Sequence, residues 1–154
     1  MNSTEISSAP KGQAAALKLW VVLARAYAAI EEQAAHHVAE HGLTLAEFGI
    51  LEALYHKGPM LLCELQRKIL VSSGGITYLV DRLEAEKLVR RRPSAEDRRA
   101  RYVELTGQGQ RLIQRVFPEH ARRLSEVLSA LSGREQRQAA ALLRKLGRQA
   151  AGLE

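Results

Sequence analysis

The chain has 154 residues, a formal net charge of +6, a pI near 9.8 and one cysteine, so an internal disulfide framework is excluded and there is little room for a second core. Uninterrupted apolar runs are short and the N-terminus lacks a signal-peptide pattern, so we expect a cytoplasmic protein with no membrane partner. The positive charge favours an anionic partner, and the abundance of alanine, leucine, arginine and glutamate favours a mostly helical fold.

The N-terminal part of the chain is expected to form a polar arm and one long helix. Residues 1–11 carry Ser, Thr and Pro without apolar periodicity, which is typical of a flexible arm. Residues 12–43 contain the helix, which Gly42 ends and whose length in a small protein predicts that it reaches beyond its own core. Apolar side chains recur on or near one stripe of it, at Leu17, Trp20, Val21, Ala24, Tyr27, Ala28 and Ile30.

A second helix is expected to begin at Leu45. Thr44 and Glu47 form a capping box, in which the two side chains satisfy each other's free backbone donors. The stretch Lys57-Gly58-Pro59 ends this helix. Its core-facing residues are Leu45, Phe48, Leu51, Leu54 and Tyr55.

The stretch from Met60 to Thr106 has the order helix, turn, helix and hairpin. Its turn, Val71-Ser72-Ser73-Gly74-Gly75, combines helix-capping serines with glycines that allow a close approach. A second helix that opens with small polar residues suits entry into a DNA groove. Each helix has one apolar stripe, formed by Leu62, Leu65 and Ile69 in the first and by Ile76, Leu79, Val80 and Leu83 in the second.

Two short strands are predicted after the second helix, at Leu88–Arg92 and Arg101–Leu105, joined by a turn that contains Pro, Ser and Asp. We call this hairpin the wing. From Arg82 to Arg101 there are eight Arg or Lys against four Asp or Glu, a balance of +4 within the chain's +6. The positive charge is therefore concentrated where the wing would meet phosphate.

Residues 107–154 are expected to form two more helices. Thr106 can cap the first of them, and Pro118 is expected to kink or restart it. Ser132 and Glu135 form a second capping box, which opens the last helix. Both ends of the chain are thus helical and could pack on each other across a two-fold axis.

Two motifs carry a family resemblance. One is Asp97-Arg98-Arg99-Ala100-Arg101-Tyr102-Val103-Glu104-Leu105-Thr106, and the other is Val80-Asp81-Arg82-Leu83-Glu84 with Leu88-Val89 after it. They resemble the wing signature and the recognition-helix end of MarR-type regulators. The resemblance implies a homodimeric winged-helix transcription factor, usually a repressor released by a small ligand or an oxidant, with its first helix in the dimer interface.

The expected fold is therefore mostly α with a small β wing. A winged helix-turn-helix region at residues 44–106 is flanked by dimerisation helices in residues 12–43 and 107–154. Five residues at the start and along the second helix of the motif are expected to face DNA: Ser72, Ser73, Thr77, Tyr78 and Arg82. The alternative is that Tyr78 packs and that Arg82 pairs with a nearby acid.

In the wing, the resemblance implies that Arg99 reaches into the minor groove and that Asp97 holds the shape of the wing by pairing with an arginine. Arg91, Arg92 and Arg98 are expected to neutralise phosphate. The alternative is a solvated basic hairpin, which the local excess of charge disfavours.

An effector pocket is expected where the long helices meet the DNA-binding region, a usual place in MarR-type proteins. The aromatic and polar candidates from the first two helices are Trp20, Tyr27, Phe48, Tyr55 and His56. The alternative, that each is an ordinary core residue, is favoured for any single one of them.

His37 and His41 are four residues apart, so one helix face could offer two imidazoles to a metal. No clear third ligand follows from the sequence, and we expect a solvent-facing helix end, no metal and no cofactor. Cys63 is expected to be a quiet, partly buried thiol, since only Arg67 nearby could lower its pKa, although a quinone-responsive role stays open.

The expected function is that of a sequence-specific transcriptional regulator. Its expected partners are double-stranded DNA with a pseudo-palindromic operator, a second copy of the chain and a small effector of phenolic or quinone-like chemistry. The alternatives are a winged-helix module that docks an acidic protein, and a metal- or redox-sensing variant of the same regulator. The sequence has no Ser-His-Asp set and no phosphate-cradling loop, so an enzyme is not expected.

Overall fold

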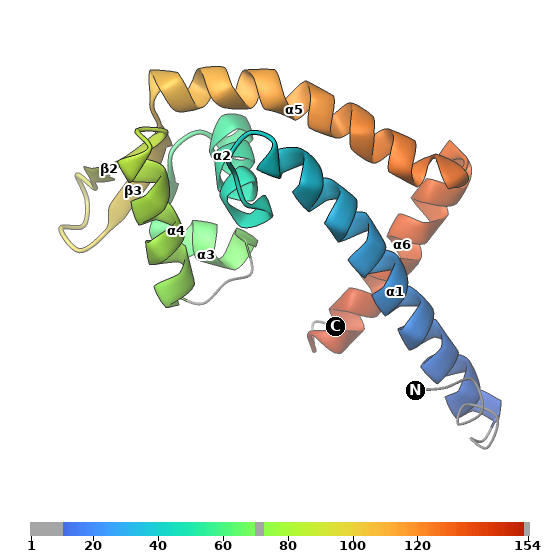
Figure 1. Cartoon of the computed structure of the whole chain (residues 1–154). Helices are drawn as coiled ribbons and strands as arrows, with labels where there is room; N and C mark the ends of the chain where they lie inside the picture. Colours follow the sequence, from blue (N-terminus) through green and yellow to red (C-terminus); the bar gives the residue numbers. More distant parts are fainter. Residues whose placement is uncertain (1–10, 70–72, 153–154) are drawn as a thin grey trace.

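The computed structural model describes residues 11–69 and 73–152 (Figure 1). The chain is mostly helical with a small antiparallel sheet, as the sequence predicts. Nearly all of the expected arm lies outside the described residues. The elements in chain order are α1 (Lys11–Ala39), α2 (Leu45–Lys57), β1 (Met60–Leu61), α3 (Leu62–Ile69), α4 (Ser73–Ala85), β2 (Val89–Pro93), β3 (Arg101–Leu105), α5 (Gly107–Val127), the short 3₁₀ helix η2 (Leu128–Ala130) and α6 (Gly133–Ala150).

Helix α2 begins at Leu45, as predicted, because the capping box at its start is formed. The Glu47 backbone N–H donates to Thr44 Oγ1 at 3.2 Å, and the Thr44 N–H donates to Glu47 Oε2 at 2.8 Å. This helix is central to the core, since it packs against α1, α3, α4, α5 and β3. Fully buried side chains from these elements meet around it, among them Ile50, Leu51, Leu65, Ile76, Val80, Leu83, Val103, Ile113 and Val116.

The sheet has the strand order β1-β3-β2, and both pairings are antiparallel. The two wing strands lie where the sequence predicts them. The third strand, β1, was not predicted, because two residues are too few to show alternation. It pairs Met60 with Val103, so it joins the start of α3 to the base of the wing.

A single turn joins the end of α4, the base of the wing and the start of α5. Lys87 has a positive φ of 59°, and the Leu88 N–H donates back to the Leu83 carbonyl at 2.9 Å, which closes α4. The Leu88 carbonyl in turn accepts from the Thr106 N–H at 3.1 Å and from Thr106 Oγ1 at 3.2 Å. Gly109, in the first turn of α5, packs directly against the same carbonyl.

Of the kink or restart expected at Pro118, the restart is wrong, because α5 runs through Pro118 as one helix. The helix ends instead at η2, and α6 then begins at Gly133 behind the predicted capping box of Ser132 and Glu135. In Figure 1, α5 spans the molecule from the wing to α6, the N-terminal half of α1 extends away from the winged region, and α6 turns back from the far end of α5.

The structure changes one expectation about α1. The sequence predicts no segment that crosses a membrane, because no uninterrupted apolar run is long enough. The helical segment Gly12–Ala39 is nevertheless long and apolar enough to cross one, by length and composition alone. Lys18 and Arg25 lie within this helix, and a basic residue near the centre of a span costs about 2.5–3.5 kcal/mol. At its C-terminal end His37 and Val38 are buried in the protein. A protein partner therefore accounts better than a bilayer for its exposed apolar side chains.

Candidate nucleic-acid interface

Helix α4 separates into a buried face and an exposed face. Ile76, Val80 and Leu83 are buried, whereas Thr77 is exposed and the Tyr78 side chain is 61% exposed. Of the other predicted contacts, Ser73 is the first residue of α4, and Ser72 lies outside the described residues. The described part of α4 thus presents polar and aromatic side chains that are not needed for the core.

Arg82 adopts the alternative arrangement. Its Nε lies 3.2 Å from Oε1 of the buried Glu47, the residue that also caps α2. A hydrogen bond with Tyr78 and the charge of Glu47 raise the pKa of Arg82 above its usual value. The Arg82 side chain remains 48% exposed, so it ties α4 to α2 while its edge still faces solvent.

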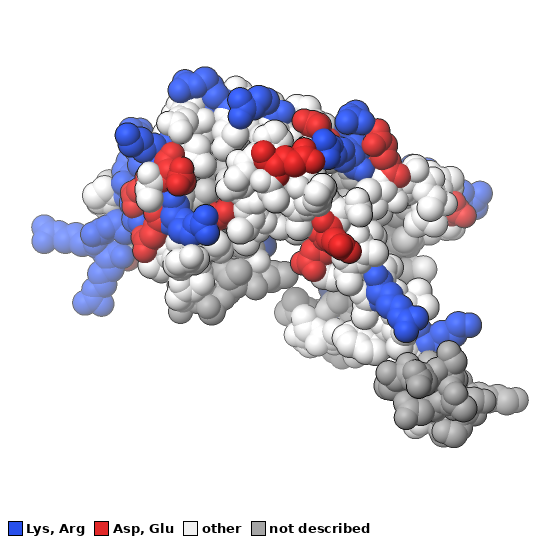
Figure 2. All heavy atoms as spheres, viewed as in Figure 1, with Lys and Arg blue, Asp and Glu red and all other residues white. Residues whose placement is uncertain are grey.

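The tip of the wing carries two exposed arginines, Arg98 and Arg99. Among the residues that the structure describes, no carboxylate lies within 4.0 Å of the Arg98 or Arg99 side chains, and both residues are exposed. Figure 2 shows Lys and Arg side chains projecting from this end of the molecule. Asp97 shapes the tip differently from the expected arginine pairing, because its Oδ1 accepts from the Arg99 backbone N–H at 2.8 Å.

Arg91 has a structural role in place of the expected phosphate contact. Its guanidinium pairs with Asp81 Oδ1 at 2.6 Å and with Glu84 Oε2, and its backbone N–H donates to Glu84 Oε1 at 3.1 Å. These contacts hold β2 against α4. Arg92 is more accessible to phosphate than Arg91, because its side chain is 51% exposed. Its Nε lies 3.5 Å from Glu104 Oε2, and its Cζ lies 5.3 Å from the centroid of the Tyr102 ring.

We expect Arg91→Met to lower the free energy of unfolding by about 1–2 kcal/mol, because the carboxylates of Asp81 and Glu84 lose the cation that they share. Arg90→Met is the matched control, because Arg90 is 68% exposed and pairs only with Glu104 among the described residues. It should cost less than about 1 kcal/mol. Urea denaturation of both variants measures the difference, and equal costs would contradict the structural role of Arg91.

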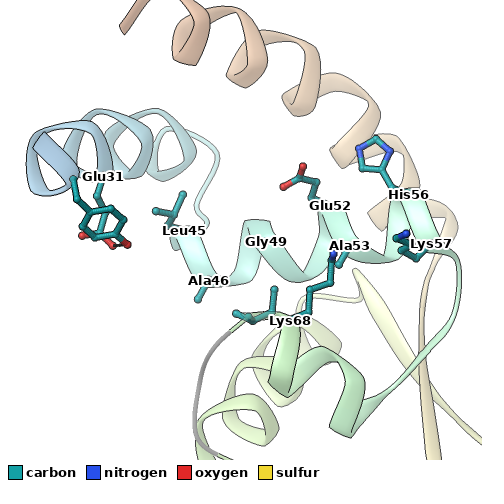
Figure 3. Close-up of a pocket in the computed structure, with 11 residues that line it drawn as sticks. Glu31, Leu45, Ala46, Gly49, Glu52, Ala53, His56, Lys57 and Lys68 are labelled. Carbon is teal, nitrogen blue, oxygen red and sulfur yellow. Dashed lines mark hydrogen bonds between the residues drawn. The ribbon is translucent and has the colours of Figure 1, made fainter. Parts of the chain in front are cut away.

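A cavity of about 490 Å³ lies between α1, α2 and α3 (Figure 3). Two of the five predicted effector residues line it, namely Tyr27 and His56, together with Glu31, Glu52 and Lys68. A hydrogen bond to Glu31, at 2.9 Å, raises the pKa of Tyr27. Charged groups of both signs therefore face a space of the size that small ligands occupy.

The other three predicted pocket residues lie elsewhere. Trp20 is 65% exposed on α1, and Phe48 is buried against the His120 ring, with 4.5 Å between the ring centroids. Tyr55 packs against His56 and Phe117. Periodicity assigned all three to apolar stripes, but it does not reveal which part of a stripe borders a cavity.

Cys63 and the histidines also differ from expectation. Cys63 is exposed, beside a hollow that Thr77, Arg99 and Arg101 help to line, so the expected partial burial is wrong. His37 is only 1% exposed, so the expected solvent-facing helix end is wrong for it. His120, distant in sequence, lies against His37, and burial together with the charge of His37 lowers its pKa.

The exposed face of α4 and the arginine-bearing wing beside it define a winged helix-turn-helix protein. Residues 41–100 match the model of the MarR family. The chain is 42% identical to the HTH-type transcriptional regulator MhqR of Bacillus subtilis over 131 residues, which are 85% of this chain and 90% of that protein. The chain therefore belongs to the MarR family, and it is a DNA-binding transcriptional regulator and not an enzyme.

Solved structures share the fold. Sco3205 of Streptomyces coelicolor, a MarR family regulator solved in complex with DNA, has a TM-score of 0.81 and 20% identity, covering 86% of each chain. BpsR of Bordetella bronchiseptica, whose DNA binding is regulated by 6-hydroxynicotinic acid, has a TM-score of 0.76 and 25% identity, covering 84% of this chain and 98% of that one.

Proposed function

We propose that this chain is a homodimeric repressor that binds a pseudo-palindromic operator and leaves it when a small effector binds. The observation that carries the DNA-binding part is the exposure, beside the exposed face of α4, of Arg98 and Arg99 at the wing tip, for which no ion pair is formed with the described acids. Ion pairs hold both elements, because Arg82 of α4 pairs with Glu47 and Arg91 of β2 pairs with Asp81 and Glu84 of α4. The two proposed DNA-facing surfaces therefore have a defined relative position.

In the proposed complex, α4 of each copy enters a major groove and the wing follows the backbone to the adjacent minor groove. Thr77 and Tyr78 face the bases, and Ser72, Ser73, Arg92 and Arg98 contact phosphate or sugar. The two half-site centres then lie about 34–36 Å apart, one turn of the duplex. Arg82, which pairs with Glu47, orients α4, and only the solvent-facing edge of its guanidinium can contact DNA.

Arg99→Ala is expected to weaken operator binding by about 1–3 kcal/mol, or about 5- to 150-fold, because the exposed guanidinium is the proposed minor-groove contact. Fluorescence anisotropy at moderate salt measures the affinity. Arg137→Ala, on the exposed surface of α6, removes the same charge away from the wing and should bind as the wild type does. Equal affinities for all three proteins would remove Arg99 from the interface.

The dimer interface is proposed to combine α1 with α6. Leu19, Trp20 and Val22 on α1 are all more than half exposed, as is Leu142 on α6. None of the residues of α6 is buried, although the helix has one apolar side. An amphipathic helix needs a partner for that side, and a second copy with the same exposed stripes supplies one.

The effector site is proposed to be the cavity between α1, α2 and α3. A small aromatic molecule with hydroxyl, carbonyl or carboxylate groups fits the lining, because Glu31, Glu52 and Lys68 offer both acceptors and a cation. The regulation of BpsR by 6-hydroxynicotinic acid supports this chemical class. Binding between α1 and the DNA-binding region would couple the cavity to the operator.

Selection of bound duplexes from a random-sequence pool tests the proposal. An inverted repeat whose half-sites are about one turn apart is the expected result. The best duplex is then titrated with simple phenols, quinones and hydroxypyridine carboxylates, and release by one of them is expected. Binding that is weak at low salt and without sequence preference would instead favour an acidic protein as the partner of the basic face.

A further inference from the structure

We propose that His37, His41 and Glu119 form a zinc-binding site between α1 and α5. One ligand atom from each residue lies within 4.8 Å of the other two. The site is separate from the DNA-facing residues and from the cavity between α1, α2 and α3, so it does not depend on the effector proposed above.

Two buried nitrogen atoms carry the inference. Nε2 of His37 and Nε2 of His41 are both buried, and neither has a hydrogen-bond partner among the described residues. His37 is 1% exposed as a whole. A buried polar atom without a partner costs about 1–3 kcal/mol, so such atoms call for an explanation. A metal ion held by His37, His41 and the nearby Glu119 carboxylate would satisfy such atoms.

The second ring nitrogen of His37, Nδ1, has a partner that can orient the ring for metal binding. This nitrogen lies 3.2 Å from Nδ1 of His120, and one of these two nitrogens donates to the other. When His37 donates, its Nε2 carries a free lone pair that faces Glu119. Metal-binding histidines usually donate their other ring N–H in this way, which sets both the tautomer and the ring orientation.

Glu119 can serve both the metal and an orienting partner. Its Oε1 accepts from Arg123 at 3.0 Å, and its Oε2 lies 3.8 Å from His37 Nε2. Arg123 also pairs with Glu40 at 3.1 Å, so the two carboxylates exceed the one guanidinium in charge. These three groups together carry a net charge of −1 beside the histidines, which favours a cation.

Two imidazoles and one carboxylate form a ligand set that suits Zn²⁺, with water as the fourth ligand. Tetrahedral ligands at about 2.1 Å from zinc are about 3.4 Å apart. The three atoms must therefore approach one another by more than 1 Å from their widest present separation. The Glu119 side chain is 41% exposed and can make this movement, whereas His37 is held by the core.

The test is a zinc titration of the full-length protein, stripped of metal, against a chromophoric zinc indicator. We expect one Zn²⁺ per chain, and at least about a 10-fold loss of affinity in both His41→Gln and Glu119→Gln. These two side chains are only partly buried, so the variants should fold, which circular dichroism checks. Zinc should also raise the Tm of the wild type and leave that of the variants unchanged.

His36→Gln is the matched control. His36 neighbours His37 in sequence, but its side chain is 77% exposed and faces Glu40, 3.9 Å away. It should bind zinc as the wild type does. The proposal is overturned if the wild type binds no more tightly than His41→Gln and Glu119→Gln, or if His36→Gln loses as much affinity as they do, because zinc would then bind surface histidines without this site.

Discussion

The double variant Leu142→Asp/Leu146→Asp is expected to be monomeric and to lose about 100-fold or more in affinity for an inverted-repeat operator. The two leucines are one turn apart on α6, and they are 68% and 42% exposed in the single chain. Each leucine that is buried on dimerisation contributes about 1.5–3 kcal/mol, and a carboxylate in its place adds a desolvation cost. Loss of the dimer removes the linkage between two half-site contacts, which is worth about 10²- to 10⁴-fold.

Analytical ultracentrifugation gives the mass, and anisotropy titration gives the operator affinity. Ala141→Asp is the control, because it places the same charged group on another face of α6 at an exposed position. It should remain dimeric and bind the operator normally. If the double variant is still dimeric at the concentrations at which the wild type is dimeric, the interface lies elsewhere.

Gly109→Ala is expected to destabilise the fold by about 3 kcal/mol or more, a severe case of overpacking. A Cβ at this position would lie 2.0 Å from the Leu88 carbonyl oxygen and 2.9 Å from its carbon. Backbone atoms cannot move aside as a flexible side chain can. The Leu88 carbonyl is also held by Thr106, so relief of the clash must separate α5 from the base of the wing.

Gly107→Ala, two residues earlier in the same helix, is the matched control. Its Cβ would meet only the end of the Arg111 side chain, at 3.4 Å. We expect a change of less than about 1 kcal/mol for this variant. Thermal and urea unfolding measure both effects. Similar stabilities for the two variants would show that the backbone at Leu88 can move away from the added Cβ at little cost.

Local chemistry accounts for what could be predicted from the sequence. The two capping boxes involve residues three apart, so the starts of α2 and α6 follow from short-range hydrogen bonds. The wing strands follow from two short stretches with Val, Leu and Tyr on either side of a turn that contains Pro, Ser and Asp. Helix α5 shows the limit of such reasoning, because contacts along its length outweigh the hydrogen bond that Pro118 removes.

Contacts between distant residues were not predictable from a single sequence. His37 and His120 are 83 positions apart, and no periodicity relates the end of α1 to the middle of α5. Arg91 looked like one of several equivalent wing arginines. Its role depends on Asp81 and Glu84, whose side chains reach it only because α4 and β2 pack together. The family resemblance located the DNA-binding region but could not separate paired arginines from unpaired ones.

The turn around Leu88 couples the orientation of α5 to that of α4 and the wing. Because α4, the wing and α5 are joined at one carbonyl, a tilt of α5 carries the DNA-binding elements with it. The 21 residues of α5 span about 32 Å, so a tilt of about 10° at one end displaces the other by about 5 Å. That exceeds the rise of one base pair, about 3.4 Å. In the proposed dimer, a small change of angle between the two copies would therefore be enough to put α4 of each copy out of register with the two half-sites.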